Sequence, residues 1–272
     1  MQKTFLSILN GSDMMIDNKT KQIVNTALMA ALIFAATFSI RVPVPFTHGY
    51  IHAGDSMIFV AVLILGWKNG AIAAGMGSAL SDLLAGYSQY ILPTLVIKGL
   101  MAVIMGLALE KSFNNKKSIF ILSTITVGVW LIFNSIIHRI ITVKAVGESD
   151  MLIDSFDDVS NNMDLTALIE KAESQIFVFA LIIPLFLIIL SLIIKKKENI
   201  SIRVPQLLGM TIAGLWMVFG YFIVEGIMYG NFAIAAFSVP WNMIQYMMGF
   251  VIAVVLWAAL EKTPIQKYYD KE

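Results

Sequence analysis

The sequence contains no cysteine among its 272 residues, so it has no disulfide framework, no thiolate metal site and no cysteine nucleophile. It is also poor in charge, because 14% of the residues are charged and 58% are hydrophobic, with a mean hydropathy of +0.80. A soluble core does not need so much apolar surface, and lipid is therefore the expected solvent. The formal net charge of +1 gives no electrostatic reason to expect a nucleic-acid partner.

Motifs for catalysis and nucleotide binding are absent as well. There is no Gly-x-x-x-x-Gly-Lys-Ser/Thr loop to hold nucleotide phosphates, no His-Glu-x-x-His helix and no Gly-x-Ser-x-Gly elbow. His48 and His52 are four residues apart, but Gly49 and Gly54 favour a loop over a helical metal site. We therefore expect no catalytic residue, no metal, no cofactor and no enzymatic activity.

Long apolar runs dominate the chain, and about 20 apolar residues are enough to cross a hydrocarbon core as a helix. Between the first two of these runs, residues 51 to 86 are apolar except at Trp67, Lys68 and Asn69, which predicts two short helices joined by a tight turn. The expected fold is therefore an all-α polytopic membrane protein with about eight spans. The six clear runs are 23–40, 91–110, 118–139, 175–194, 206–229 and 237–259.

Charge along the chain predicts the orientation. With eight spans, the lysine-containing connections all fall on one side of the membrane, and the acidic stretch 148–173 falls on the other. Basic connections face the cytoplasm, so both termini, 1–21 and 262–272, are expected to be cytoplasmic. Residues 1–21 show no signal-peptide pattern, and Met14 or Met15 is an alternative start.

Residues 113–203 form a candidate insertion, because two strongly apolar spans flank a polar, acidic loop unlike its surroundings. The loop does not have the residue order of a calcium-binding loop, and we expect it to be solvated. Removing this segment leaves a core of six helices, with 22–112 supplying the first four and 204–261 the last two. The expected fold is thus a six-helix core plus an inserted pair of transmembrane helices.

Several polar residues interrupt the spans, and a charge at mid-membrane is costly to keep. Lys98, Glu225, Asp55, Asn242 and Gln245 all fall in the outer half of their spans, as does Asp82. This one-sided cluster is typical of a site that orients a small polar ligand from outside. Lys98 has two alternatives to ligand contact: it could form an ion pair with Glu225, or its side chain could reach outward to the membrane surface. For Asp55 the alternative to ligand contact is a role as a helix cap.

Aromatic residues at the same depth are available to cover a ligand. Interfacial belts would also place Tyr and Trp at this depth, so this signal does not decide between the two roles. The residues concerned are Tyr87, Tyr90, Tyr221, Trp241 and Tyr246.

Small residues form a stripe on the first span, where Ala27, Ala31 and Ala35 recur at every fourth position. Such a stripe lets another helix approach closely in lipid, either from a partner protein or from the same chain. The dense set of small residues at 71–79 is assigned to packing within the chain. Only the first stripe is a candidate for partner docking.

The chain resembles a known family in several runs of sequence. The runs HAGDSMIFVA from His52, LGWKNGA from Leu65, GMGSALSDLLAGY from Gly75 and PTLVIKG from Pro93 are similar to the S components of energy-coupling factor (ECF) transporters, particularly the riboflavin-transporter-like group. GYFIVE from Gly220 and PWNMIQ from Pro240 resemble the last two helices of that family. The likeness covers about 20–112 and 204–260, and leaves the inserted pair as a departure.

The resemblance implies a substrate-specificity subunit that binds a vitamin-like small molecule from outside. It implies a transmembrane coupling subunit and two cytoplasmic ATPase subunits as partners, docked through Ala27, Ala31 and Ala35, and a subunit that topples in the bilayer, which the inserted pair puts in question. The candidate substrate-binding residues are Asp55, Thr94, Lys98, Tyr221, Glu225, Asn242 and Gln245. Riboflavin, pyridoxine, thiamine precursors and pantothenate remain open as ligands. A self-sufficient secondary transporter and a membrane-embedded enzyme are the alternatives.

Overall fold

A computed structural model describes residues 18–44, 49–109, 116–144, 147, 149–156, 159–196 and 204–262. The long helices are α2 (Asn18–Ser39), α3 (Gly54–Ala85), α4 (Ile91–Leu109), α5 (Lys116–Arg139), α8 (Asn162–Lys196), α9 (Val204–Met228) and α10 (Phe232–Leu260). The short elements are the strands β1 (Arg41–Val44) and β2 (Gly49–His52), the 3-10 turn η1 (Ser88–Tyr90), the π-helical turn η2 (Ile140–Lys144) and the helix α7 (Ser149–Ser155).

Helix α3 is a hairpin rather than one straight rod. Gly66 interrupts it with a left-handed φ of 72°, which a residue without a Cβ adopts at little cost. A Cβ on Gly70 would lie 3.3 Å from the Cα of Val62, so the chain folds back on itself after Gly66. The predicted pair of short helices is therefore present, and the break falls one residue before Trp67, where the turn was expected.

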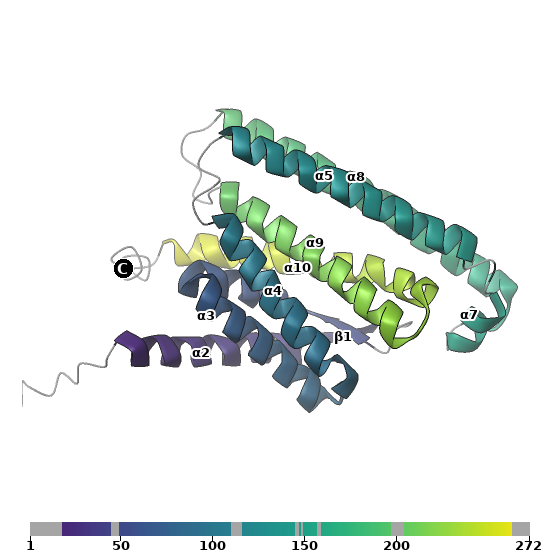
Figure 1. The fold of residues 1–272 in the computed structure, drawn as a ribbon, viewed down its shortest axis with the longest axis horizontal. Helices are drawn as coiled ribbons and strands as arrows, with labels where there is room; N and C mark the ends of the chain where they lie inside the picture. The colour runs from purple at the N-terminus through teal and green to yellow at the C-terminus, as the bar shows by residue number, and fades with distance from the viewer. Residues whose placement is uncertain are drawn as a thin grey trace, which may run out of the picture.

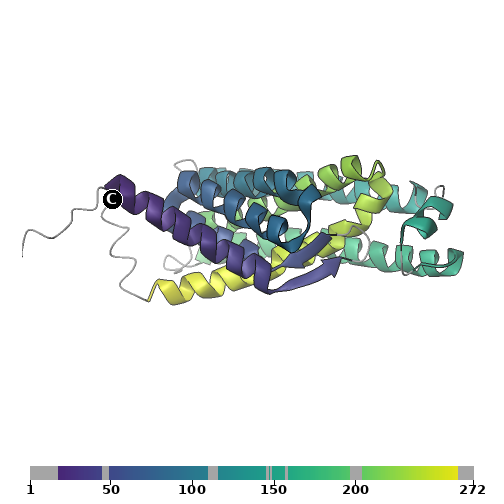
Figure 2. The same cartoon turned by 90° about the horizontal axis from the view of Figure 1, so that it is seen from below.

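The long helices lie roughly parallel to the long axis of the molecule, and the chain passes back and forth along that axis (Figure 1). Seven described helices are long and apolar enough to span a membrane, and the break at Gly66 divides one of them in two. Helix α2 begins and α10 ends at the same end of the bundle (Figure 2), as an even number of crossings requires. The β-hairpin, the short helix α7 between α5 and α8, and the connections α3–α4 and α9–α10 lie at the other end, which we call the site end.

Large apolar side chains cover the outside of the bundle. Leu92, Phe120, Ile132, Leu181 and Val255 are all more than half exposed and come from four helices, α4, α5, α8 and α10. In water such a surface would aggregate, whereas in lipid it needs no protein partner. The fold is therefore that of an all-α polytopic membrane protein, as the sequence predicts.

A β-hairpin occupies the connection between α2 and α3, where the sequence indicated only a loop. Strands β1 and β2 pair antiparallel, with Arg41 opposite His52 and Val44 opposite Gly49. Residues 45–48 between them lie outside the described residues, and so does His48 of the possible histidine pair. The hairpin places the backbone of β2 next to the start of α3.

Helices α5 and α8 lie side by side on one face of the molecule, on the far side of α9 from α2 and α3 (Figure 1). Trp130 of α5 donates a hydrogen bond to the carbonyl of Phe179 on α8 at 3.1 Å. Phe133 of α5 packs edge-on against Phe222 of α9, with ring centroids 5.6 Å apart. Phe186 of α8 also packs edge-on against Phe250 of α10, with ring centroids 5.3 Å apart, so the pair is attached to the bundle through both α9 and α10.

The acidic stretch predicted as a loop at 148–173 is partly helical. Helix α8 starts at Asn162, because the side chain of Asn161 accepts hydrogen bonds from the backbone N–H groups of Met163 and Asp164 at 2.8 and 3.0 Å. Asp164 in turn accepts one from the backbone N–H of Ser160 at 3.1 Å. Glu170 and Glu173 are thus residues of a helix, and the span expected at 175–194 begins 13 residues earlier.

Small residues let α2 pack closely on the second half of α3. A Cβ on Gly77 would lie 2.5 Å from the carbonyl oxygen of Ala30, so no side chain fits there. Ala73, Ala74 and Ala79 of the same helix are also buried. The dense set at 71–79 therefore serves packing within the chain, whereas Ala27, Ala31 and Ala35 of α2 are exposed.

Candidate functional site

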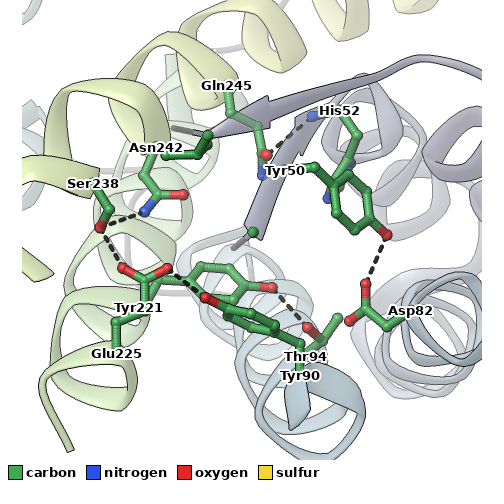
Figure 3. Close-up of a pocket in the computed structure, with 12 residues that line it drawn as sticks. Tyr50, His52, Asp82, Tyr90, Thr94, Tyr221, Glu225, Ser238, Asn242 and Gln245 are labelled. Carbon is green, nitrogen blue, oxygen red and sulfur yellow. Dashed lines mark hydrogen bonds between the residues drawn. The ribbon is translucent and has the colours of Figure 1, made fainter. Parts of the chain in front are cut away.

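A polar pocket lies between the β-hairpin and helices α3, α4, α9 and α10 at the site end (Figure 3). Its free space is about 30 Å³, room for about one water molecule, so a vitamin-sized ligand requires the wall side chains to move apart. Its lining residues are Val44, Gly49, Tyr50, His52, Asp82, Tyr90, Thr94, Tyr221, Glu225, Ser238, Asn242 and Gln245.

Two tyrosine rings form one side of the pocket. Tyr90 is the last residue of the turn η1, and Tyr221 lies one turn before Glu225 on α9. Their ring centroids are 6.4 Å apart and the ring planes are inclined by 51°. The hydroxyl of Tyr221 is held 3.0 Å from that of Thr94 on α4, so a hydrogen bond fixes the ring against the neighbouring helix. The arrangement offers flat apolar surface with hydroxyl groups at its edge.

Glu225 is the centre of a hydrogen-bonded group on the α9–α10 side. One carboxylate oxygen accepts from the hydroxyl of Tyr90 at 3.3 Å, and the other accepts from the hydroxyl of Ser238. The amide of Asn242 donates to the same Ser238 hydroxyl oxygen at 3.4 Å. Ser238 and Asn242 are one turn apart on α10, so the helix itself aligns them with Glu225.

The hairpin side of the pocket is anchored to α3 through Tyr50. Its hydroxyl donates to Asp82 at 2.7 Å and lies 3.3 Å from the hydroxyl of Ser81. Burial and the nearby Asp82 carboxylate raise the pKa of Tyr50 well above its usual value, because both disfavour a phenolate. Tyr50 therefore remains a hydrogen-bond donor to Asp82 across the physiological pH range.

A fully buried ion pair joins α3 to α4 next to the pocket. The ammonium of Lys98 binds the carboxylate of Asp55, and neither side chain is exposed. The ammonium also lies 5.4 Å from the ring centroid of Tyr221, which lines the pocket. The alternative in which Lys98 pairs with Glu225 is wrong. The capping alternative for Asp55 is also wrong, because α3 starts without a side-chain cap and the carboxylate binds Lys98.

Gln245 connects this ion pair to the hairpin. Its side-chain N–H donates to Asp55 at 2.9 Å, and its side-chain oxygen accepts from the backbone N–H of His52 at 3.1 Å. The imidazole of His52 accepts from the backbone N–H of Gly54 at 3.0 Å. Burial, reinforced by Lys98, lowers the pKa of His52 to about 3, so the ring is neutral at neutral pH.

The structure brings all seven predicted substrate-binding residues to one end of the bundle. Five of them line the pocket, namely Thr94, Tyr221, Glu225, Asn242 and Gln245. Asp55 and Lys98 lie behind the lining, bound to each other. Of the aromatic residues considered, Tyr90 and Tyr221 line the pocket, whereas Tyr87, Trp241 and Tyr246 do not.

Sequence reasoning missed the contribution of the hairpin. Tyr50 and His52 were not proposed as pocket residues, because the hairpin was read as an external loop. Ser238 was missed as well, although it lies four residues before Asn242, on the same helical face. Within the described ranges, no three His, Asp or Glu side chains are placed to share a metal ion.

The stripe of Ala27, Ala31 and Ala35 lies on α2, apart from the pocket. Ala27 and Ala31 line a shallow apolar groove together with Ile72, Met76 and Leu80 of α3. Among the described residues Ala27, Ala31 and Ala35 are exposed, and their face is smooth, as a docking surface in lipid would be.

Comparison with known proteins supplies the family. The model of the ECF-type riboflavin transporter S component family matches residues 17–156 and 173–262. The chain belongs to this family. It is therefore a substrate-specific transporter subunit of a multi-pass membrane type. The match includes most of 113–203, so the family model does not set that segment apart, and the insertion remains a prediction.

Two curated relatives match shorter stretches. The "thiamine precursor transporter HmpT" of Lactococcus lactis subsp. cremoris is 32% identical over 110 residues, which is 40% of this chain and 66% of the relative. An uncharacterised protein of Pyrococcus woesei is 42% identical over 74 residues, 27% of this chain and 49% of the relative. The chain thus spans about half to two thirds of the relatives it matches. No solved structure matches significantly.

Proposed function

We propose that the chain is the substrate-specificity subunit of an ATP-driven vitamin importer, which binds a vitamin or a related small molecule in the pocket at the site end. The observation that carries the proposal is the pocket itself. Its polar side chains come from four helices and a β-hairpin, and they converge on one small space within a membrane protein. Such convergence is typical of a ligand site rather than of packing.

The proposed route is inward from the site end. Lysine-containing connections predict that the opposite end is cytoplasmic, with both termini there. Lys68 follows the Gly66 turn, and Lys117 starts α5, both away from the pocket. The pocket then faces outward and can take its ligand from the external medium.

The energy for uptake is proposed to come from partners. The sequence has no nucleotide-binding loop, so a transmembrane coupling subunit and two cytoplasmic ATPase subunits would have to supply it. The exposed stripe of Ala27, Ala31 and Ala35 suits close approach by a helix of the coupling subunit. None of the described residues of 113–203 lines the pocket, which supports an accessory role for that segment.

Blocking the alanine stripe should reduce uptake of the vitamin and leave ligand binding unchanged. Ala31→Trp places a large ring on the proposed docking face, so vitamin uptake by cells containing the partner subunits should fall at least about tenfold. Ligand binding by the purified variant should be unchanged, because Ala31 lies outside the pocket. Ala167→Trp is the matched control, on an exposed site of α8 on the opposite face of the molecule.

Two outcomes would contradict the proposal. Normal uptake by Ala31→Trp would show that the stripe is not a docking surface. Uptake into liposomes by the chain alone, without ATP or partners, would favour a self-sufficient secondary transporter instead.

A further inference from the structure

We infer that helix α7 and Phe156, the residue after it, support the wall of the pocket from behind, and that Phe156 is a positioning residue for the ligand. Phe156 does not line the pocket. It acts through Phe237 on the next residue of α10, Ser238, which binds Glu225 in the wall. The inference rests on the proposed function, because it concerns the same pocket, but the first of its tests needs no ligand.

Helix α7 lies beside the connection between α9 and α10 at the site end (Figure 1). The rings of Phe156 and Phe237 pack edge-on, with centroids 5.4 Å apart and ring planes inclined by 82°. Both side chains are at most 2% exposed, and Leu152, one turn before Phe156, is fully buried. The segment between α5 and α8 is therefore packed onto the start of α10.

A polar contact holds the same part of α10. Asn231 caps the helix, because its side-chain oxygen accepts a hydrogen bond from the backbone N–H of Ala233 at 2.7 Å. Its side-chain amide donates to the Sδ of Met151 on α7 at 3.0 Å. Helix α7 and Phe156 thus hold the start of α10 at two points, the capping residue and Phe237.

Helix α5 supports the neighbouring part of α9. The ring of Phe222, which packs on Phe133 of α5, also contacts that of Phe232 at the start of α10, with centroids 5.4 Å apart. A Cβ on Gly226 would lie 2.3 Å from the Phe232 ring, so α9 and α10 are closely packed here. Glu225 is the residue before Gly226. Rings from α5 and from the residue after α7 therefore back the part of the wall that contains Glu225.

The start of α10 needs support from outside the helix because Pro240 interrupts its hydrogen bonds. Proline has no backbone N–H, so the carbonyl of Ala236 does not receive the bond that a helix would normally provide. Residues 232–239 are for this reason less firmly tied to the rest of α10. Ser238, with its bond to Glu225, belongs to this stretch.

The support matters for the ligand because the pocket is almost filled by its own side chains. Its free space is about 30 Å³, so a ligand enters or leaves only when wall side chains move apart. Ser238 is one of these side chains. A firmly held start of α10 keeps Ser238 beside Glu225, and a loosened one lets them separate. The contacts of α7 and Phe156 therefore set the rate at which a ligand is released.

Hydrogen–deuterium exchange of the full-length chain in detergent tests this support without a ligand. Phe156→Ala removes the ring that packs on Phe237, so the backbone amides of 229–239 should exchange at least about tenfold faster. Amides around Gly66, at the opposite end of the bundle, should not change. Phe156→Leu keeps most of the buried apolar volume and should exchange at nearly the rate of the parent.

Phe186→Ala is the matched control. Phe186 of α8 also packs edge-on against a ring of α10, that of Phe250, with centroids 5.3 Å apart and ring planes inclined by 84°. This contact lies about three turns after Ser238, away from the pocket. Phe186→Ala should leave the exchange of 229–239 unchanged.

A second variant does not depend on a buried ring. Met151 is 57% exposed, so Met151→Ala leaves the core intact and removes only the acceptor for Asn231. Exchange of 229–239 should become about threefold faster. Met163→Ala, at an 81% exposed methionine of α8, is its control and should have no effect.

Ligand release is the second readout. Radiolabelled riboflavin, pyridoxine, thiamine and pantothenate are each offered to the parent chain, and the release of any that binds is followed after addition of the unlabelled compound. Phe156→Ala should release it at least about tenfold faster, whereas Phe156→Leu and Phe186→Ala should stay within about twofold of the parent.

The outcomes separate this inference from the proposed function. Unchanged exchange of 229–239 in Met151→Ala and in folded Phe156→Ala would overturn the inference and leave vitamin binding intact. An equal increase in Phe186→Ala, or one that extends to the amides around Gly66, would also overturn it, because a general loss of stability would then explain the effect. If none of the four compounds binds and cells with the partner subunits show no uptake, the proposed function fails, and exchange still decides whether α7 supports α10.

Discussion

The buried pair between Lys98 and Asp55 yields the sharpest prediction about stability. Lys98→Met leaves the Asp55 carboxylate without a partner in a site where neither side chain has any solvent exposure. Breaking a buried pair in this way costs about 3–5 kcal/mol of unfolding free energy. Asp55→Asn leaves the ammonium unpaired and should cost a similar amount.

The double variant distinguishes pairing from other causes. In Lys98→Met/Asp55→Asn both charges are gone, and the new amide oxygen at position 55 still accepts the hydrogen bond that Gln245 donates to Asp55. Its unfolding free energy should lie within about 1 kcal/mol of the parent, because a neutral replacement of a buried pair is often tolerated. The two single costs should therefore be strongly non-additive.

Unfolding in mixed micelles with increasing SDS, followed by tryptophan fluorescence, measures these costs. Trp216 donates a hydrogen bond to the carbonyl of Ile97, the residue before Lys98, at 3.2 Å, so one reporter lies next to the pair. Additive single costs, or a Lys98→Met cost below about 1 kcal/mol, would refute the reasoning. Because neither residue lines the pocket, the double variant should also keep its ligand affinity within about threefold.

Two further predictions concern packing and pH. Gly77→Ala should lower the unfolding free energy by about 1–3 kcal/mol, because its Cβ would meet the Ala30 carbonyl, whereas Gly128→Ala, with open space around it, should be neutral or stabilising; equal melting points would contradict this. The pKa of His52 is about 3 in the folded chain and 6.5 in the unfolded chain. The contribution of neutral His52 to the unfolding free energy is therefore fully present above pH 6.5, and it falls by about 1.4 kcal/mol per pH unit below that. His52→Gln should flatten that slope in melts between pH 7 and 5, with the exposed His138→Gln as control, and an unchanged slope would contradict the assignment.

The fold was largely predictable because hydropathy reports what a lipid environment requires. The six clear runs correspond to α2, α4, α5, α8, α9 and α10, and the polar interruption at 67–69 located the hairpin in α3. The early start of α8 was missed because its first turns are polar and lie outside the apolar run. A local signal was present, since Asn161 and Asp164 have the spacing of a helix cap.

The site was harder to predict because its geometry depends on a non-local feature. Position along the chain puts Lys98 and Glu225 in the outer half of their spans, which made Glu225 a candidate partner for Lys98. The β-hairpin brings the start of α3 next to Gln245, and so places Asp55 within reach of Lys98. The two strands, which pair with Arg41 opposite His52, have only four residues each, so they leave no strong strand pattern in the sequence. Depth along a span therefore identified the residues of the site but not their partners.

The choice of partner for Lys98 decides which carboxylates border the pocket. A pair with Glu225 would leave Asp55 and Asp82, both on α3, as the acidic groups next to it. The observed pair with Asp55 leaves Asp82 on α3 and Glu225 on α9, on opposite sides of the tyrosine rings. The buried ion pair thus fixes which carboxylates border the pocket, although neither of its own residues lines it.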